Sequence, residues 1–141
     1  MAAYNKFQDY AEQLCKGKHD WSAHTFKVAL TNTAPLATNT VLADITQIAA
    51  SGGYTAGGFL LDSVALVESA GTAKVTIADE VITAAGGSMG PFRYFVIYND
   101  TQTAPAKPLV CWYDYGSALT LASGESVTLD FDAAAGVWTL A

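Results

Sequence analysis

The first seventeen residues carry apolar side chains at helical spacing. The apolar positions recur every three or four residues, as expected for one face of a helix, and they are Tyr4, Phe7, Tyr10 or Ala11, and Leu14. Polar side chains fill the positions between them. Gly17 supplies the left-handed residue that commonly follows a helix. The pattern therefore predicts an amphipathic helix over residues 4–16, within an N-terminal segment that spans residues 1–17.

After Gly17 the period of the apolar positions changes from 3.6 residues to two. Residues 24–32 alternate between apolar and polar side chains, which predicts a half-buried strand. Residues 33–58 are less regular and predict loops, with one short helix over residues 41–44. From residue 59 onward, turn signals separate a series of candidate strands at intervals of about 8 to 12 residues. These strands are 59–68, 72–78, 80–84, 92–99, 108–115, 117–121, 125–132 and 136–140.

This spacing predicts an all-β fold, namely an antiparallel β-sandwich of jelly-roll or immunoglobulin-like type with one N-terminal α-helix. Strands and helices do not alternate, so a doubly wound parallel sheet is disfavoured. A chain of 141 residues makes one globular domain, in which the sandwich occupies residues 18–141. Aromatic side chains concentrate in residues 92–98 and 112–115. They either fill the centre of the sandwich or form a platform on which sugar rings stack.

Composition narrows the choice of partners. Hydrophobic residues make up 51% of the chain, charged residues make up 14%, and the net charge is −6. Nucleic-acid binding needs clustered Lys and Arg, whereas the seven basic residues are scattered and only Arg93 is an arginine. We therefore expect no contact with nucleic acid or with anionic membrane. No apolar stretch is long enough to span a bilayer, and residues 8–13 are too polar for a signal peptide, so we expect synthesis in a cytosol.

Two patterns suggest catalysis, and we reject both. Residues 86–90 read GGSMG and match the G-x-S-x-G nucleophile elbow, but that motif requires a helix after Ser88. The residues that follow have the pattern of a strand, which favours a Gly-rich hairpin loop. Asp130 and Asp132 share one face of a predicted strand, where two carboxylates are more often solvated than catalytic. We expect no enzymatic activity and no catalytic residues.

Metal ligands are also sparse. His19, His24 and Cys15 lie close in sequence, but they show none of the ligand spacings of zinc sites. We expect a solvated His19, a His24 at the surface or in a capping position, and free thiols at Cys15 and Cys111 that pack as small hydrophobes. No metal and no cofactor is predicted.

Arg93 needs a carboxylate partner, and Asp114 on the next strand is the candidate for a structural salt bridge.

Several segments together resemble one known family. They are FKVALTN (26–32) followed by TAP (33–35), TNTVLADITQIA (38–49), GGYTAGG (52–58), GGSMGPFRYFVIYND (86–100), PLVCWYDYG (108–116) and SGESVTLDFDAAAGVWTL (123–140). In this order they resemble small virion structural proteins of tailed bacteriophages, over nearly the whole chain beyond the first helix. The resemblance implies a capsid decoration, or cement, protein on the outer surface of the major capsid protein shell. A tail, neck or receptor-binding module of the virion is the alternative.

A protein of this class works by contact. A chain of this mass should expose about 7,000 Å², and a standard interface covers about 800 Å² of each partner. The helix could dock in a groove on a neighbour through Tyr4, Phe7, Tyr10 and Leu14, or it could cover an open face of its own sandwich. Few charges are available to protect strand edges, so we expect a dimer or trimer on the particle.

Overall fold

The computed structural model describes residues 3–141 and shows a mostly β protein whose strands pair in antiparallel fashion. One α-helix, α1 (Gln8–Cys15), and one 3-10 helix, η1 (Leu42–Asp44), occur among these residues. The strands are β1 (Asn5–Lys6), β2 (Phe26–Thr31), β3 (Phe59–Leu60), β4 (Ala65–Ser69), β5 (Thr72–Thr76), β6 (Glu80–Thr83), β7 (Met89–Asn99), β8 (Leu109–Leu121), β9 (Ser126–Leu129) and β10 (Trp138–Leu140). The predicted all-β sandwich with one N-terminal helix is thus confirmed.

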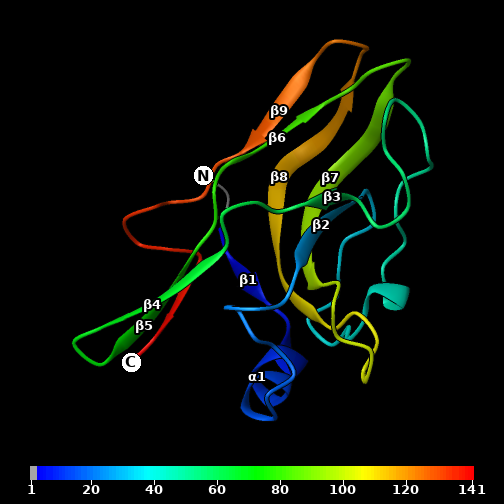
Figure 1. The fold of residues 1–141 in the computed structure, drawn as a ribbon. Helices are drawn as coiled ribbons and strands as arrows, with labels where there is room; N and C mark the ends of the chain where they lie inside the picture. The colour runs from blue at the N-terminus through cyan, green and yellow to red at the C-terminus, as the bar shows by residue number, and fades with distance from the viewer. Residues whose placement is uncertain (1–2) are drawn as a thin grey trace.

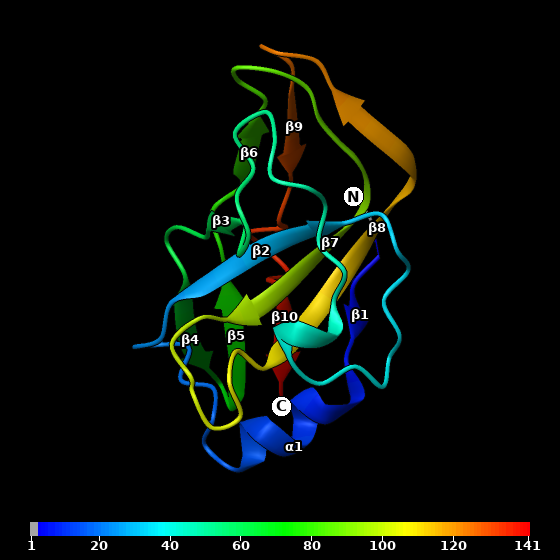
Figure 2. The same ribbon diagram turned by 90° about the vertical axis from the view of Figure 1, so that its right-hand side faces the viewer.

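The strands form two layers. One layer is a five-stranded sheet in the order β1-β8-β7-β2-β3. The other layer consists of the two-stranded sheet β6-β9 and the three-stranded sheet β10-β5-β4 (Figures 1 and 2). The main core lies between the layers, where Val28 and Ile97 from the large sheet share one cluster with Val75 and Ile82 from the smaller ones. Apolar burial between the layers is the main force that holds them together.

Aromatic residues of β7 and β8 mostly fill this core, as one of the two interpretations predicted. Phe92, Phe95 and Tyr113 belong to this main cluster. Tyr98 is also buried, but it belongs to a second cluster, with Val96 and Leu109. Tyr94 and Trp112 are partly exposed, and Tyr115, at the middle of β8, is about half exposed. The rings therefore do not form the exposed row that sugar stacking requires.

Helix α1 begins at Gln8, four residues later than Tyr4, where the helical period begins. The backbone before it is extended because Asn5 and Lys6 pair with Trp112 and Cys111 of β8. This pairing gives the backbone N–H and C=O groups at the edge of β8 hydrogen-bond partners. The free energy gained from the pairing outweighs the local preference of residues 4–7 for a helix. Residues 1 and 2 of the predicted N-terminal segment lie outside the described residues.

Two predicted strand boundaries are wrong. The predicted strands 108–115 and 117–121 form the single strand β8 (Leu109–Leu121), although a turn was predicted at Gly116. Gly116 adopts a φ of 102° within the strand, and the ladder with β7 continues beyond it through register shifts. Conversely, the predicted strand 59–68 is broken into β3 and β4, because residues 61–64 leave the ladder and Ser63 takes a φ of 51°.

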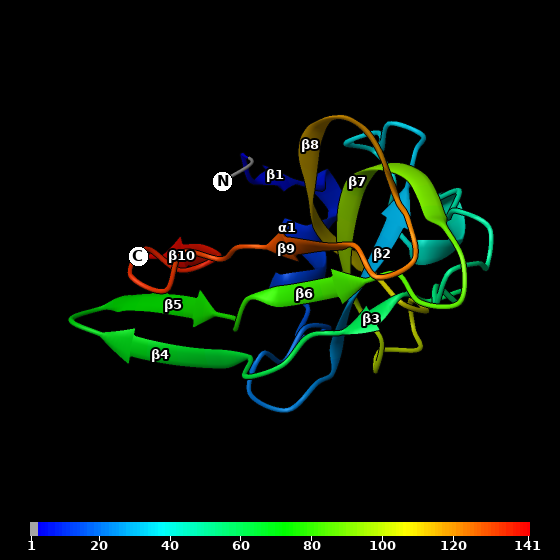
Figure 3. The same ribbon diagram turned by 90° about the horizontal axis from the view of Figure 1, so that it is seen from above.

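The β4–β5 hairpin projects away from the rest of the molecule (Figures 1 and 3). Its two-residue turn consists of Ala70 and Gly71, which both have positive φ values of 50° and 84°. Two left-handed residues in succession are the mark of a type I′ turn, whose twist matches that of the two strands. Strand β4 has no neighbour on its outer side and is therefore a free edge of its sheet.

Candidate interaction surface

Two of the four predicted contact residues hold α1 onto its own domain. Phe7 is buried and packs on Trp112 with ring centroids 4.7 Å apart. Tyr10 is also buried, and its hydroxyl accepts a hydrogen bond of 2.7 Å from Nε1 of Trp21. With α1 in this position, neither side chain can reach a partner. The structure supports the interpretation that the helix covers part of its own sandwich.

The other two predicted residues, Tyr4 and Leu14, are only partly buried and face β10. They line one side of a groove, and Trp138 and Leu140 line the other. Lys6 and Thr139 supply polar groups at its rim. The groove therefore runs between the strand edge of β1, the side of α1 and strand β10, with mostly apolar walls.

A second groove adjoins the first. Its apolar lining combines Leu14, Trp138 and Leu140, which also line the first groove, with Trp21 and with Leu66 and Ala73 of the hairpin. Leu140 is 59% exposed and Leu66 is 42% exposed. We call the partly exposed apolar residues of the two grooves, Tyr4, Leu14, Leu66, Trp138 and Leu140, the apolar surface. A continuous exposed patch of this kind is typical of a protein contact site.

The register of the small sheet explains how these side chains come together. Trp138, Val75 and Leu66 are cross-strand neighbours, and Leu140 pairs with Ala73. Directly opposed residues of a sheet project from the same face. That face is turned toward α1 and the segment after it. Val75 is buried there, whereas Leu66, Trp138 and Leu140 stay partly exposed and are open to a partner. Sequence reasoning missed Leu66, Trp138 and Leu140 because their apposition to Leu14 depends on the packing of α1.

Two unpaired polar atoms lie beneath the second groove. Nε2 of His19 and Nε1 of Trp138 are buried and have no hydrogen-bond partner within the chain. Each lacks the stabilisation that buried donors normally receive. Both side chains line the second groove. Among the described residues, the Tyr113 hydroxyl in the main core is likewise buried without a partner.

His19 is buried, which corrects the expectation of a solvated side chain. It lies between the Tyr10 and Phe26 rings. Nδ2 of Asn99 lies 3.3 Å from Nδ1 of His19 and 2.9 Å from Nδ1 of His24. Because an amide nitrogen only donates, both histidines accept at Nδ1. Burial, and to a smaller extent the nearby His24, lower the pKa of His19 to about 4, so the ring is neutral at pH 7.

The remaining candidate residues do not form a metal site in the part of the chain that is described. Among residues 3–141, no three His, Cys, Asp or Glu side chains are placed to bind one ion. Cys15 and Cys111 are free thiols, as predicted; Cys111 is buried, but Cys15 is exposed on α1 and does not pack as a small hydrophobe.

The two patterns that resemble catalytic motifs lie in turns. Ser88 is exposed and is followed directly by β7, so a strand stands where an elbow would need its helix. Asp130 and Asp132 lie beyond the end of β9, which corrects their placement on one strand. Asp132 accepts hydrogen bonds from the backbone N–H groups of Ala134 and Ala135. These bonds explain why the chain turns there, since Asp side chains commonly cap such turns.

Arg93 and Asp114 form the predicted salt bridge. Nε of Arg93 lies 2.7 Å from Oδ1 of Asp114, and Nη2 lies 3.0 Å from Oδ2. The guanidinium holds the pKa of Asp114 below its usual range, and the N–H of Gly116 contributes in the same direction. This bidentate salt bridge helps to fix the pairing of β7 with β8 beside Gly116.

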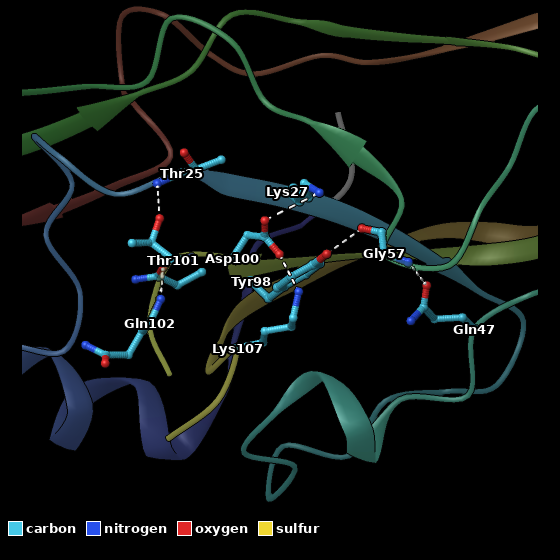
Figure 4. Close-up of polar contacts among 10 residues, drawn as sticks. Thr25, Lys27, Gln47, Gly57, Tyr98, Asp100, Thr101, Gln102 and Lys107 are labelled. Carbon is cyan, nitrogen blue, oxygen red and sulfur yellow. Dashed lines mark hydrogen bonds and ion pairs between the residues drawn. The ribbon is translucent and has the colours of Figure 1, made fainter. Parts of the chain in front are cut away.

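A polar cluster at the end of β7 is the other notable group (Figure 4). Asp100 accepts from Nζ of Lys107 at 2.6 Å and lies 3.4 Å from Nζ of Lys27, and these cations lower the pKa of Asp100. The Tyr98 hydroxyl donates to the carbonyl of Gly57, whose own N–H donates to Gln47. These bonds join β2, the end of β7 and two connections, residues 45–58 and residues 100–108, and sequence spacing could not have brought their residues together.

Comparisons with known proteins return no relative. No protein-family model, no curated protein and no solved structure matches the chain. No helix among residues 3–141 is both long and apolar enough to span a membrane.

Proposed function

We propose that this protein is a structural component of a tailed-bacteriophage particle, and specifically a capsid decoration protein. It is made in the host cytoplasm and binds the outer surface of the major capsid protein shell. The sequence segments described above support the virion assignment through their resemblance to that family. The observation that carries the contact role is the apolar surface, which is left uncovered at the junction of α1, β10 and the hairpin.

The size of the molecule suits this role. Its accessible surface is 6749 Å², close to the value expected from its mass. A contact of about 800 Å² with the shell would use roughly an eighth of that surface. Enough remains for contacts with neighbouring copies, and contacts that form together bind far more tightly than each does alone. Decoration then stabilises the shell by joining subunits that would otherwise separate.

The low charge of the chain supports a partner that is recognised by shape and apolar contact. Leu140 is the most exposed member of the apolar surface, and it lines both grooves. Burial of a leucine side chain contributes about 1.5–3 kcal/mol. Several such residues in one patch supply the kind of central apolar cluster on which protein interfaces depend.

The copy number per particle tests this proposal. We would purify virions made from the genome that encodes this protein and quantify the chain against the major capsid protein by mass spectrometry. A decoration protein is expected at a fixed and high ratio to the shell subunit. A few copies per particle would instead indicate the tail, neck or receptor-binding module, and absence from the mature virion would contradict both roles.

A further inference from the structure

Strand β4 is a free edge of the β10-β5-β4 sheet, and we propose that it pairs with β4 of a second copy of this chain. The pairing is antiparallel, about a two-fold axis at Val67. It joins the two small sheets into one continuous sheet of six strands. This inference concerns the purified protein and stands independently of the proposed function.

The β4 edge lacks the features that normally prevent such pairing. Natural edge strands are protected by Pro, Lys, bulges or short length. Strand β4 has no Pro or Lys, its ladder with β5 is regular over five residues, and it is longer than β1, β3 or β10. Its one charged residue, Glu68, reaches toward the turn and accepts a hydrogen bond of 2.7 Å from the Gly71 N–H. Val67, at the middle of the strand, is 53% exposed.

The turn fixes which backbone groups face outward. Ser69 and Thr72 flank a two-residue turn and therefore form a hydrogen-bonded pair. Because the hydrogen-bonded pairs alternate along an antiparallel ladder, Val67 also bonds to β5, whereas Leu66 and Glu68 direct their N–H and C=O groups to the free edge. A two-fold axis at Val67 places Leu66 opposite Glu68 of the second copy. The outward N–H and C=O groups of Leu66 and Glu68 then form hydrogen bonds with those of the second copy, and all five residues of β4 are paired.

Charge favours a second copy in this register. Residues 63–77 contain one acid, Glu68, and one base, Lys74, so the hairpin is neutral although the chain carries a net charge of −6. Two hairpins can therefore approach without local repulsion. Centring the pair on Val67 sets each Glu68 against a leucine, whereas centring it on Glu68 would oppose two carboxylates, which is destabilising.

The shape of the molecule permits the pairing. The hairpin projects from the body, so rotation about an axis through its middle leaves the two bodies at opposite ends (Figure 3). Neighbouring antiparallel strands keep their faces in common, so Leu66 of both copies lies on the same side of the joined sheet. That side carries the apolar surface. The dimer consequently presents two such surfaces in one direction.

Sedimentation of the purified full chain tests the proposal. We expect a dimer at micromolar concentration, and we expect V67K to weaken dimerisation at least tenfold because it places a charge at the two-fold axis. The matched control is V81K, since Val81 of β6 is 57% exposed and lies outside the proposed contact. A monomeric wild-type chain at every concentration, or a dimer that V67K leaves unchanged, would overturn the proposal.

A cross-link provides a test that does not depend on tolerance of a new charge. A non-hydrogen-bonded pair brings opposite Cα atoms to about 4.5 Å, which suits a disulfide. In a C15A background, V67C should form a covalent dimer under mild oxidation and V81C should not. If V67C stays uncross-linked, or if V81C cross-links equally, the β4 pairing is refuted.

Discussion

Trp21 donates its indole N–H to the Tyr10 hydroxyl, with 2.7 Å between Nε1 and the oxygen. Trp21 also stacks on Phe26 at the start of β2, with ring centroids 3.7 Å apart. The bond therefore connects α1 to the large sheet through the segment between them. This contact makes the N-terminal helix part of the core, and it positions Leu14 beside β10.

Removing the Tyr10 hydroxyl should destabilise the protein without changing its shape. Y10F leaves the buried Trp21 N–H without an acceptor, which lowers the free energy of unfolding by about 1–3 kcal/mol. Urea denaturation measures the loss. The control is Y115F, because Tyr115 is half exposed and its hydroxyl remains accessible to water. Equal stability of Y10F and Y115F would show that the Tyr10–Trp21 bond does not hold the helix.

Gly58 should tolerate no side chain, because its backbone lies against β2. A Cβ atom there would lie 1.9 Å from the carbonyl oxygen of Val28, and the φ of 77° is strained for other residues. Gly86 has nearly the same φ, 75°, but open space around it. G58A should therefore cost more than about 3 kcal/mol of unfolding free energy, whereas G86A should cost about 1 kcal/mol. A similar loss in both variants would mean that φ alone, and not the close approach, explains the glycine.

Burial of neutral His19 should make the fold sensitive to mild acid. The folded pKa of about 4 lies below the ordinary histidine pKa of 6.5, so the unfolded chain binds more protons between these limits. Unfolding free energy then rises with pH and is lost as the pH falls from about 6.5 to about 4, by up to about 3 kcal/mol. Urea titrations at several pH values measure this slope.

The variant H19Q isolates the His19 contribution from that of the carboxylates. The lowered pKa values of Asp44, Asp100 and Asp114 remove stability only below their unfolded value near 3.8, outside most of this window. Glu80, whose pKa is raised by burial, acts in the opposite direction as the pH rises above its usual range. We therefore expect H19Q to flatten the slope between pH 4 and 6.5. An unchanged slope would assign the acid sensitivity to another group.

The fold class could be predicted from the sequence because period-two alternation and turn residues are local signals. Strand β2 and the Arg93–Asp114 pair follow from such patterns. The start of α1 could not be predicted, because the helical period at Tyr4 yields to pairing with an edge of β8 that only the folded sheet provides. Only part of the apolar surface could be predicted from the sequence, for the same reason. Leu14 follows from helical spacing, but Trp138 and Leu140 lie more than 120 residues further along the chain and reach Leu14 only through packing in the folded protein.

The most direct test of the account compares shell binding by two leucine variants. Leu140 lies in the apolar surface and is 59% exposed, whereas Leu36 is 63% exposed in a loop outside it. We would mix purified wild type, L140D and L36D with phage heads that lack this protein, and measure the bound fraction by co-sedimentation. We predict that wild type and L36D bind and that L140D binds about tenfold more weakly or worse. Failure of the wild type to bind, or equal binding by L140D and L36D, would contradict the account.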